Sequence, residues 1–299
     1  MIIFLGLFLR ARLRYDDAFW DAAERLVFKV LFPPLLFLSV AQSRLTPSSA
    51  ALFLSMGVSS MLLAVVASAS LRLFIKDNPV THASVFQCGF RFNTYIGFSI
   101  CLQLFDQTGF ALLALLIAFW VPISNTIAVS VLASAVAKAE GGAVGKKHSV
   151  FKTIVTNPLI IATVLGLAWN VTGWTIPTVP AVFLKHLGSA SLAMGLLCIG
   201  AGLRLQAFRG HGALIVASTI ERLMVVPAIA WGMGAVFSLS SVQAGVLLLF
   251  AALPTAQSCY VMTATMRGDA ASVAGVTTAQ TSAAMATLPV WTALIQSLT

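Results

Sequence analysis

The chain has 299 residues, of which 59% are hydrophobic and only 9% are charged, with a mean hydropathy of +0.96 and a formal net charge of +9. Soluble domains are about a quarter charged, so this composition excludes an ordinary soluble protein and predicts a polytopic membrane protein. The basic residues fall mainly in short connections between apolar runs, where they indicate membrane topology rather than a nucleic-acid partner.

Apolar runs of spanning length, about 20 residues, follow one another along the whole chain and leave no room for a separate soluble domain. We therefore expect an all-α fold with ten transmembrane helices, the first of them too short for a complete span. The predicted spans are residues 1–9, 22–40, 51–75, 80–104, 109–137, 152–172, 181–204, 212–238, 242–266 and 270–297.

The lysines and arginines outside the spans lie almost entirely on one side of this topology. Because cytoplasmic loops are enriched in Lys and Arg, we expect a multi-pass protein of the cell membrane, the inner membrane of a bacterium, with both termini non-cytoplasmic. The cytoplasmic set is Arg10, Arg12, Arg14, Arg72, Lys76, Lys138, Lys146, Lys147, Lys152, Arg204, Arg209 and Arg267, against only Arg44 and Lys185 on the other side.

A polar cytoplasmic linker, residues 138–151, separates a first half (1–137) from a second half (152–299) of five spans each. The second half then enters the membrane from the opposite side, which is the arrangement of an inverted repeat. A shift of about 160 residues carries FRFNTYIG in the fourth span onto AALPTAQSCY in the ninth. The same shift places the start of the first helix some eight residues before Met1, so we expect a start upstream of Met1 or a truncated first helix.

The fourth and ninth spans carry polar residues at their centres. At 1.5 Å per helical residue, Asn93 and Pro254 lie about 20 Å and about 18 Å into their spans, near the middle of a core about 30 Å thick. Helices that break at this depth and cross commonly build transporter substrate sites, with the positive ends of half-helices facing anions. The candidate substrate-binding residues are Arg91, Asn93, Thr94, Gly97, Pro254, Thr255, Gln257 and Ser258.

Each of these features also has a plainer explanation. Pro254 alone is compatible with a simple kink, and Asn93 and Thr94 with hydrogen bonds between helices. Arg91 is costly in a membrane, at about 2.5 to 3.5 kcal/mol, and is either an anion contact or a member of an ion pair. Glu221 lies deep in the eighth span beside Arg222; it either carries a proton for coupling or pairs with Arg91 or Arg222, and we favour the ion pair.

Other chemistry-bearing residues give no catalytic, metal or cofactor prediction. The four cysteines lie inside apolar runs without ligand spacing, and the four histidines lie near span ends. Asp16 is expected to cap the second helix. Two further polar groups are expected either to line one cavity with the candidate substrate-binding residues or to pack between helices. They are Ser124, Asn125 and Thr126 in the fifth span and Gln280, Thr281 and Ser282 in the tenth.

Three stretches resemble the auxin efflux carrier family of membrane transporters: RFNTYIGFSICLQLFDQTG, NPLIIATVLGL and AALPTAQSCYVMTATMRGDAASVAGVTTAQTSAAMATLPVW. The resemblance covers nearly the whole chain. It implies two inverted five-helix repeats, a scaffold domain and a transport domain in which the broken fourth and ninth helices cross, a homodimer, and elevator-like transport of organic anions. Many members have proline at the fourth-helix break, where the nearest equivalent in this chain is Ser99. The break is therefore expected either to be softer or to be made by Gly97 and Asn93 alone.

The resulting hypothesis is a secondary transporter of a small organic anion, auxin-like or another carboxylate, embedded in the lipid bilayer. A receptor or sensor on the same fold is the alternative, since a fold does not determine a function. An intramembrane enzyme is disfavoured because Glu221 has no deep histidine or second carboxylate to work with.

Overall fold

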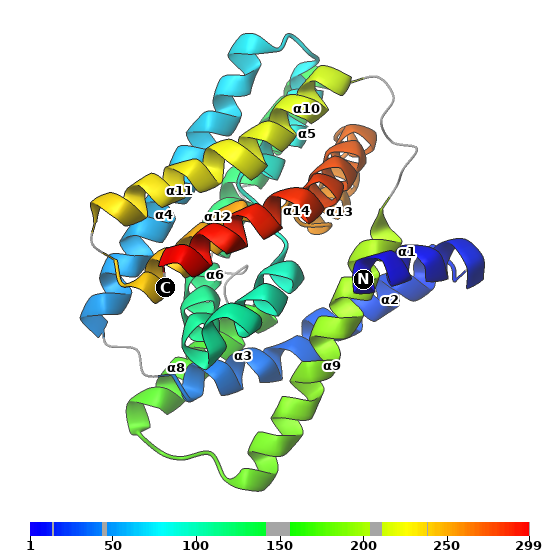
Figure 1. Ribbon diagram of the computed structural model, residues 1–299. Coiled ribbons are helices and arrows are strands. Elements are labelled where there is room, and N and C mark those ends of the chain that lie inside the picture. The colour runs from blue at the N-terminus through cyan, green and yellow to red at the C-terminus, as the bar shows by residue number, and fades with distance from the viewer. Residues whose placement is uncertain (14, 44–46, 142–155, 204–210, 238, 299) are drawn as a thin grey trace. The chain divides into compact units, whose positions relative to one another are not determined.

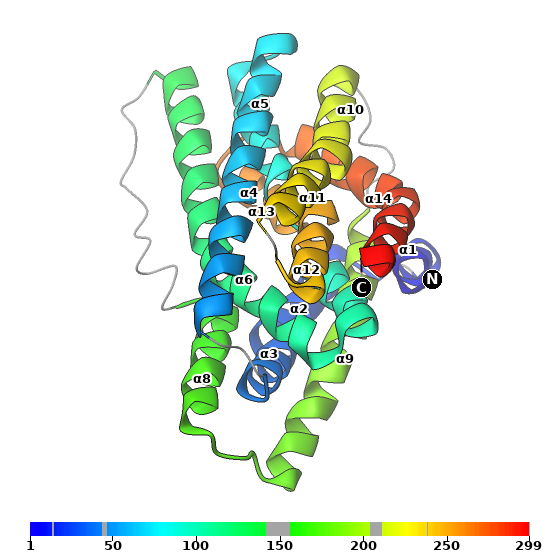
Figure 2. The same ribbon diagram turned by 60° about the vertical axis from the view of Figure 1, so that its left-hand side comes forward.

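The computed structural model describes residues 1–13, 15–43, 47–141, 156–203, 211–237 and 239–298. Within this part of the chain the regular structure is helical, with no strand (Figures 1 and 2). Most of the predicted linker 138–151 lies outside the described residues, as do Arg14, Arg44, Lys146, Lys147, Lys152, Arg204 and Arg209.

The chain forms two compact units, each built from discontinuous segments. Unit 1 contains residues 1–50, 95–118 and 151–203, and unit 2 contains residues 51–94, 119–150 and 204–299. Each unit therefore draws on both of the five-span halves that the sequence predicts. The long helix α6 (Thr94–Ala139) passes through both units and covers the end of the fourth predicted span and all of the fifth without a loop.

In unit 1, α1 (Ile2–Leu13) packs along α9 (Thr178–Gly202), and α3 (Phe32–Ala41) packs on both α8 (Pro158–Thr172) and α9. The backbones of α1 and α9 approach so closely that a Cβ on Gly6 would meet the Leu197 carbonyl and one on Gly200 would meet that of Ile3. Small residues allow such close packing of membrane helices.

Local sequence signals account for several helix ends in unit 1. As expected, Asp16 caps α2 (Asp17–Leu26), accepting a hydrogen bond from the Phe19 N–H at 2.8 Å. Asn157 caps α8 and Pro158 occupies its first turn, which explains the NPL start of that helix. A π-helical turn, η1 (Val27–Leu31), precedes the two prolines of α3, which have no N–H to donate.

Unit 2 holds most of α4 (Pro47–Phe74), together with α5 (Pro79–Phe86), α10 (Gly212–Ile220), α11 (Val226–Val236), α12 (Ser241–Ala252), α13 (Ser258–Thr265) and α14 (Ala270–Leu298). Helix α14 packs against α5, α10, α12 and α13, so it is the common neighbour of these elements. A π-helical turn, η3 (Glu221–Val225), joins α10 to α11.

Among the described residues, four helices are long and apolar enough to cross a membrane: Ala50–Phe74, Gln107–Ala139, Thr178–Gly202 and Gly212–Val236. Two further helices, Pro158–Thr172 and Ser241–Ala252, are also apolar but shorter. These helices agree with a polytopic membrane protein, while ten spans and an inverted repeat stay predictions.

Candidate functional site

The fourth predicted span is interrupted where the sequence places its polar residues. Helix α5 ends at Phe86 and continues into a short 3-10 turn, η2 (Gln87–Gly89). Residues 91–93 are not helical, and α6 begins at Thr94. The interruption leaves several backbone groups without helical partners, and each would cost several kcal/mol if it faced lipid.

The ninth span is interrupted in the same way. Helix α12 ends at Ala252, residues 253–256 are not helical, and α13 begins at Ser258. The two interruptions touch, because the Asn93 N–H donates a hydrogen bond of 2.8 Å to the Pro254 carbonyl oxygen. The rings of Phe92 and Phe250 pack beside this contact with their centroids 4.4 Å apart. We call these two interrupted segments the crossover, residues 87–94 and 250–258.

Arg222 holds the ends of both interrupted helices. Its Nε donates to the Leu253 carbonyl at 2.7 Å and its Nη2 to that of Phe250 at 3.2 Å, both at the end of α12. Its Nη1 reaches the Gly89 carbonyl at the end of η2, at 3.4 Å. Arg222 is fully buried, and helix C-termini carry partial negative charge, so these carbonyl groups also balance its positive charge.

Two further side chains satisfy the backbone of the crossover. Gln280 of α14 accepts a hydrogen bond from the Thr255 N–H at 2.9 Å and donates to the Cys88 carbonyl at 3.4 Å. The indole N–H of Trp120 donates to the Phe90 carbonyl at 3.0 Å. Gln280 and Trp120 are fully buried, so buried side chains supply hydrogen-bonding partners to both interruptions.

The π-helical turn that carries Arg222 follows from Pro227. Proline has no N–H, so the Leu223 carbonyl four residues earlier loses its helical donor. The indole N–H of Trp291 replaces that donor, at 2.9 Å. Pro227 and Trp291 thus support the helix segment on which Glu221 and Arg222 lie, and π-helical turns often occur at functional sites.

Arg91 occupies a different position from Arg222. It is half-buried, and its guanidinium donates to Gln87 Oε1 at 2.7 Å and to Ser258 Oγ at 3.0 Å, at the beginning of α13. A weaker contact of 3.5 Å joins it to the sulfur of Met262. These three partners are uncharged. Arg91 therefore places a positive charge at the N-terminal end of α13. Its hydrogen-bonding partners do not neutralise this charge.

Glu221 is buried, at 3% exposure, and its two carboxylate oxygens accept no hydrogen bond from the residues that the structure describes. Neither arginine thus forms the hydrogen-bonded ion pair that the sequence favours. The reason for Arg222 is that its donors point to the backbone carbonyls of the crossover. The donors of Arg91 are directed to Gln87, Ser258 and Met262 instead.

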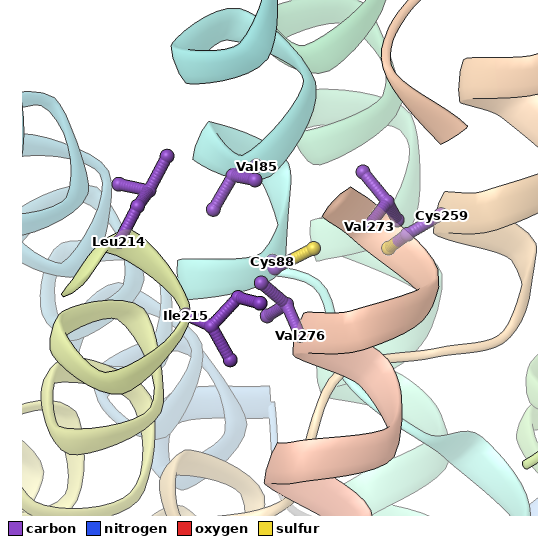
Figure 3. Packing of buried hydrophobic residues seen from close by; sticks show 7 residues of the cluster. All are labelled: Val85, Cys88, Leu214, Ile215, Cys259, Val273 and Val276. Atoms are coloured by element: carbon purple, nitrogen blue, oxygen red, sulfur yellow. The ribbon is translucent and has the colours of Figure 1, made fainter. Parts of the chain in front are cut away.

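A hydrophobic cluster packs against the crossover and joins four helical segments (Figure 3). Its buried members are Val85, Cys88, Leu214, Ile215, Cys259, Val273 and Val276. Cys88 lies in the first segment of the crossover and Cys259 directly follows the second, in α13, and their thiols contact each other. The cluster therefore fixes the first half of one interrupted helix against the second half of the other.

The predicted substrate-binding residues divide into buried and accessible groups. Asn93, Pro254 and Thr255 are buried and hold the crossover together. Arg91, Thr94 and Gln257 are half-buried and Ser258 is exposed, so these four are the more accessible members of the set. The expectation that Gly97 helps to make the break needs correction, because Gly97 and Ser99 both lie inside α6.

Several residues that build the site were not singled out from the sequence. Trp120 gave no signal beyond being aromatic in an apolar span, and Gln87 gave none beyond its spacing from Arg91. Gln280 was noted as a cavity-lining candidate, but its hydrogen bonds to the backbone of both interrupted segments depend on contacts between distant parts of the chain. The spacing of Gln87 and Arg91, four residues apart, is the one local pattern that pointed to their contact.

Comparison with known proteins gives an independent result. No match was found among curated proteins. A family model described as membrane transport protein matches residues 1–292, almost the entire chain. The chain therefore belongs to the membrane transport protein family, which includes the auxin efflux carriers, and it is a transporter of the membrane.

Proposed function

We propose that this protein is a secondary-type transporter of a small organic anion, an auxin-like acid or another carboxylate, which binds at the crossover. The observation that supports this most directly is the half-buried Arg91, whose partners Gln87, Ser258 and Met262 are all uncharged. A carboxylate that approaches Arg91 also meets the beginning of α13, where backbone N–H groups and the helix dipole favour negative charge.

The division of the crossover into two groups of residues supports the same function. Arg222, Gln280 and Trp120 complete the buried backbone, while Arg91, Thr94, Gln257 and Ser258 face accessible space. A site for a small anion needs a rigid frame with a few accessible polar groups. We further propose that the unit carrying the crossover moves in an elevator-like manner in a homodimer, as the family suggests.

A ligand screen followed by a transport assay tests the proposal. Purified protein is heated in the presence of organic acids, because a ligand that binds only the folded state raises the unfolding temperature. The acid that raises the unfolding temperature most is then labelled, and its uptake into proteoliposomes is measured. We expect Arg91→Gln to weaken binding by about 10-fold to 100-fold, since a hydrogen bond to a charged group contributes about 1.5 to 3 kcal/mol.

Two control variants make the result specific. Arg91→Lys keeps the positive charge and should keep part of the affinity. Arg267→Gln removes an arginine that is 83% exposed and should bind as the unchanged protein does. Unaltered affinity and uptake in Arg91→Gln would contradict the site assignment.

The receptor alternative makes a different prediction in the same experiment. A sensor would bind the acid with the same dependence on Arg91 but would carry no flux across the vesicle membrane. Uptake of the labelled acid above that of empty vesicles therefore separates the two functions.

A further inference from the structure

Glu221 is the least compensated charged group in the described part of unit 2. It lies about 15 Å from the start of α10, at 1.5 Å per residue, and its carboxylate oxygens accept no hydrogen bond from the described residues. An isolated ionised carboxylate in an apolar interior is very costly, whereas a carboxyl group that carries a proton is tolerated. The packing around Glu221 therefore suits a neutral carboxyl group.

Arg222 does not alter this conclusion, although it is the charged group that acts on Glu221 from the same helix. Its guanidinium is directed to three carbonyl groups, at the ends of α12 and η2. The partial negative charges of these helix ends balance Arg222. Arg222 therefore satisfies its donors without a hydrogen bond to Glu221.

Ser68 of α4 is the polar neighbour of Glu221. A Cβ built on Gly89 would collide with both Ser68 Oγ and the Glu221 carboxylate, so the two side chains meet in the space that Gly89 leaves open. The Ser68 hydroxyl donates its own proton to the Phe86 carbonyl at 2.8 Å. Its oxygen is then oriented to accept a hydrogen bond, which a proton-bearing Glu221 can donate.

Ser68 also lines a cavity of about 870 Å³ within unit 2, between α4, α5 and the second part of α6. Arg72 and Lys138 line the same cavity near the ends of α4 and α6, on the side expected to be cytoplasmic. Ser130 and Ser134 add hydroxyl groups along the α6 wall. A cavity of this size with these polar groups on mostly apolar walls can hold water, which needs only about 30 Å³ per molecule and two to four polar partners.

We propose that Glu221 is a proton-binding site whose proton arrives from the cytoplasmic side through this cavity, by way of Ser68. The proposal rests on the proposed transport function only for its purpose, which is the coupling of proton binding to anion movement. Protonation itself needs no substrate. A proton passes from cavity water to the carboxylate and leaves by the same route, so no other reactant is required.

Infrared spectroscopy of the protein in lipid vesicles tests the proposal without a substrate. A carboxyl group that carries a proton has a carbonyl stretching band that shifts in D₂O as the proton exchanges. We expect a pH-dependent band that is lost in Glu221→Gln, moved in Glu221→Asp, and kept in the control Glu24→Gln. A band that persists unchanged in Glu221→Gln and Glu221→Asp, or the absence of any such band, would overturn the proton site.

The rate of the D₂O shift tests the route. Ser68→Ala removes the relay oxygen, and Ala135→Phe fills the cavity from α6. We expect both to slow the exchange of the Glu221 proton at least several-fold. Leu73→Phe, on α4 but 80% exposed and outside the cavity, should exchange as the unchanged protein does. Equal exchange rates in all variants would overturn the route.

The outcome is independent of the transport assay. If the band and its exchange behave as expected while no organic acid is carried, the proton site stands and the proposed function fails. If an acid is carried and the band does not depend on Glu221, the transport function stands and the proton site fails.

Discussion

At the scale of single residues, the two arginines of the crossover illustrate how burial separates structural from functional charge. Both lie in apolar spans and look equally costly in the sequence. In the fold, Arg222 is fully buried and donates to three carbonyl groups, while Arg91 is half-buried beside Ser258. Arg222 therefore maintains the crossover, and Arg91 is the arginine that the proposed function assigns to the anion.

Replacement of Arg222 by lysine should destabilise the protein although the charge is kept. An ammonium group is a compact point charge and cannot reproduce the fork that reaches Leu253, Phe250 and Gly89. Because unsatisfied buried acceptors cost about 1 to 3 kcal/mol each, we expect a loss of about 2 kcal/mol or more. Thermal unfolding of Arg222→Lys measures it, with Arg267→Lys as the exposed control. An unchanged unfolding temperature in Arg222→Lys would contradict the role of Arg222.

At the scale of elements, the interruptions depend on neighbouring helices as well as on their own sequences. Pro254 removes one donor at the ninth-span break, yet the fourth-span break has no proline at all. In the fourth-span segment the freed backbone groups are bonded to side chains from η3, α6 and α14. In the ninth-span segment they are bonded to side chains from η3 and α14. Helix α14 is thus part of the site even though it has no interruption of its own.

Gln280 on α14 provides a test of this dependence. Gln280→Leu keeps the size of the side chain but removes the acceptor for the Thr255 N–H and the donor for the Cys88 carbonyl. Two buried backbone groups lose a partner, so we expect a loss of about 2 kcal/mol or more. Unfolding of the purified protein measures the effect. Gln296→Leu, the same change at an exposed position of the same helix, should have little effect; equal effects would show that α14 does not support the crossover in this way.

At the scale of the whole molecule, the connections of unit 2 are tied together by a polar cluster at the ends of predicted spans. Asp269, before α14, accepts hydrogen bonds from the Ser272 N–H at 3.0 Å and hydroxyl at 2.7 Å, and from the Thr81 hydroxyl of α5 at 2.8 Å. His211, before α10, lies 2.6 Å from Asp77 and 3.8 Å from Asp269. The cluster therefore links three connections that are far apart in the sequence.

This cluster predicts how stability depends on pH. Burial raises the pKa of Asp269. The hydrogen bonds from Ser272 and Thr81 and the charge of His211 lower this pKa by more than burial raises it, so it falls below its usual value. The pKa of Asp77 also falls below its usual value. Burial raises it, but the hydrogen bond from the Asn78 N–H and the interaction with His211 together lower it by more. A group with a lowered folded-state pKa contributes stability above its unfolded pKa, about 3.9 for Asp, and loses it as the pH falls through the folded value.

The thermal unfolding of Asp269→Asn tests this prediction. It is measured between about pH 3 and pH 7, a range that includes the unfolded-state pKa of Asp. Asparagine keeps the helix cap but removes the charge. We expect the variant to unfold at a lower temperature than the unchanged protein above about pH 4 and the difference to shrink below it. A difference that stays constant over the whole range would contradict the prediction.

The composition and hydropathy of the chain are enough to predict a helical membrane protein, several of its helix ends and the presence of polar residues in the fourth and ninth predicted spans. These features follow from hydrophobicity along the chain and from proline, glycine and capping residues, which act locally. The match of the two segments at a shift of about 160 residues also predicts that Asn93 and Pro254 lie together, and the structure has a hydrogen bond between them.

Only the tertiary structure decided the partners of those residues. Arg222 has its donors on carbonyl groups rather than on Glu221, Gly97 lies inside a helix, and Gln280 and Trp120 complete the interrupted backbone. These assignments depend on which side chains of distant segments meet inside unit 2. The pattern of one sequence does not specify the direction of a buried side chain, since many neighbours can satisfy the same donor or acceptor and packing selects among them.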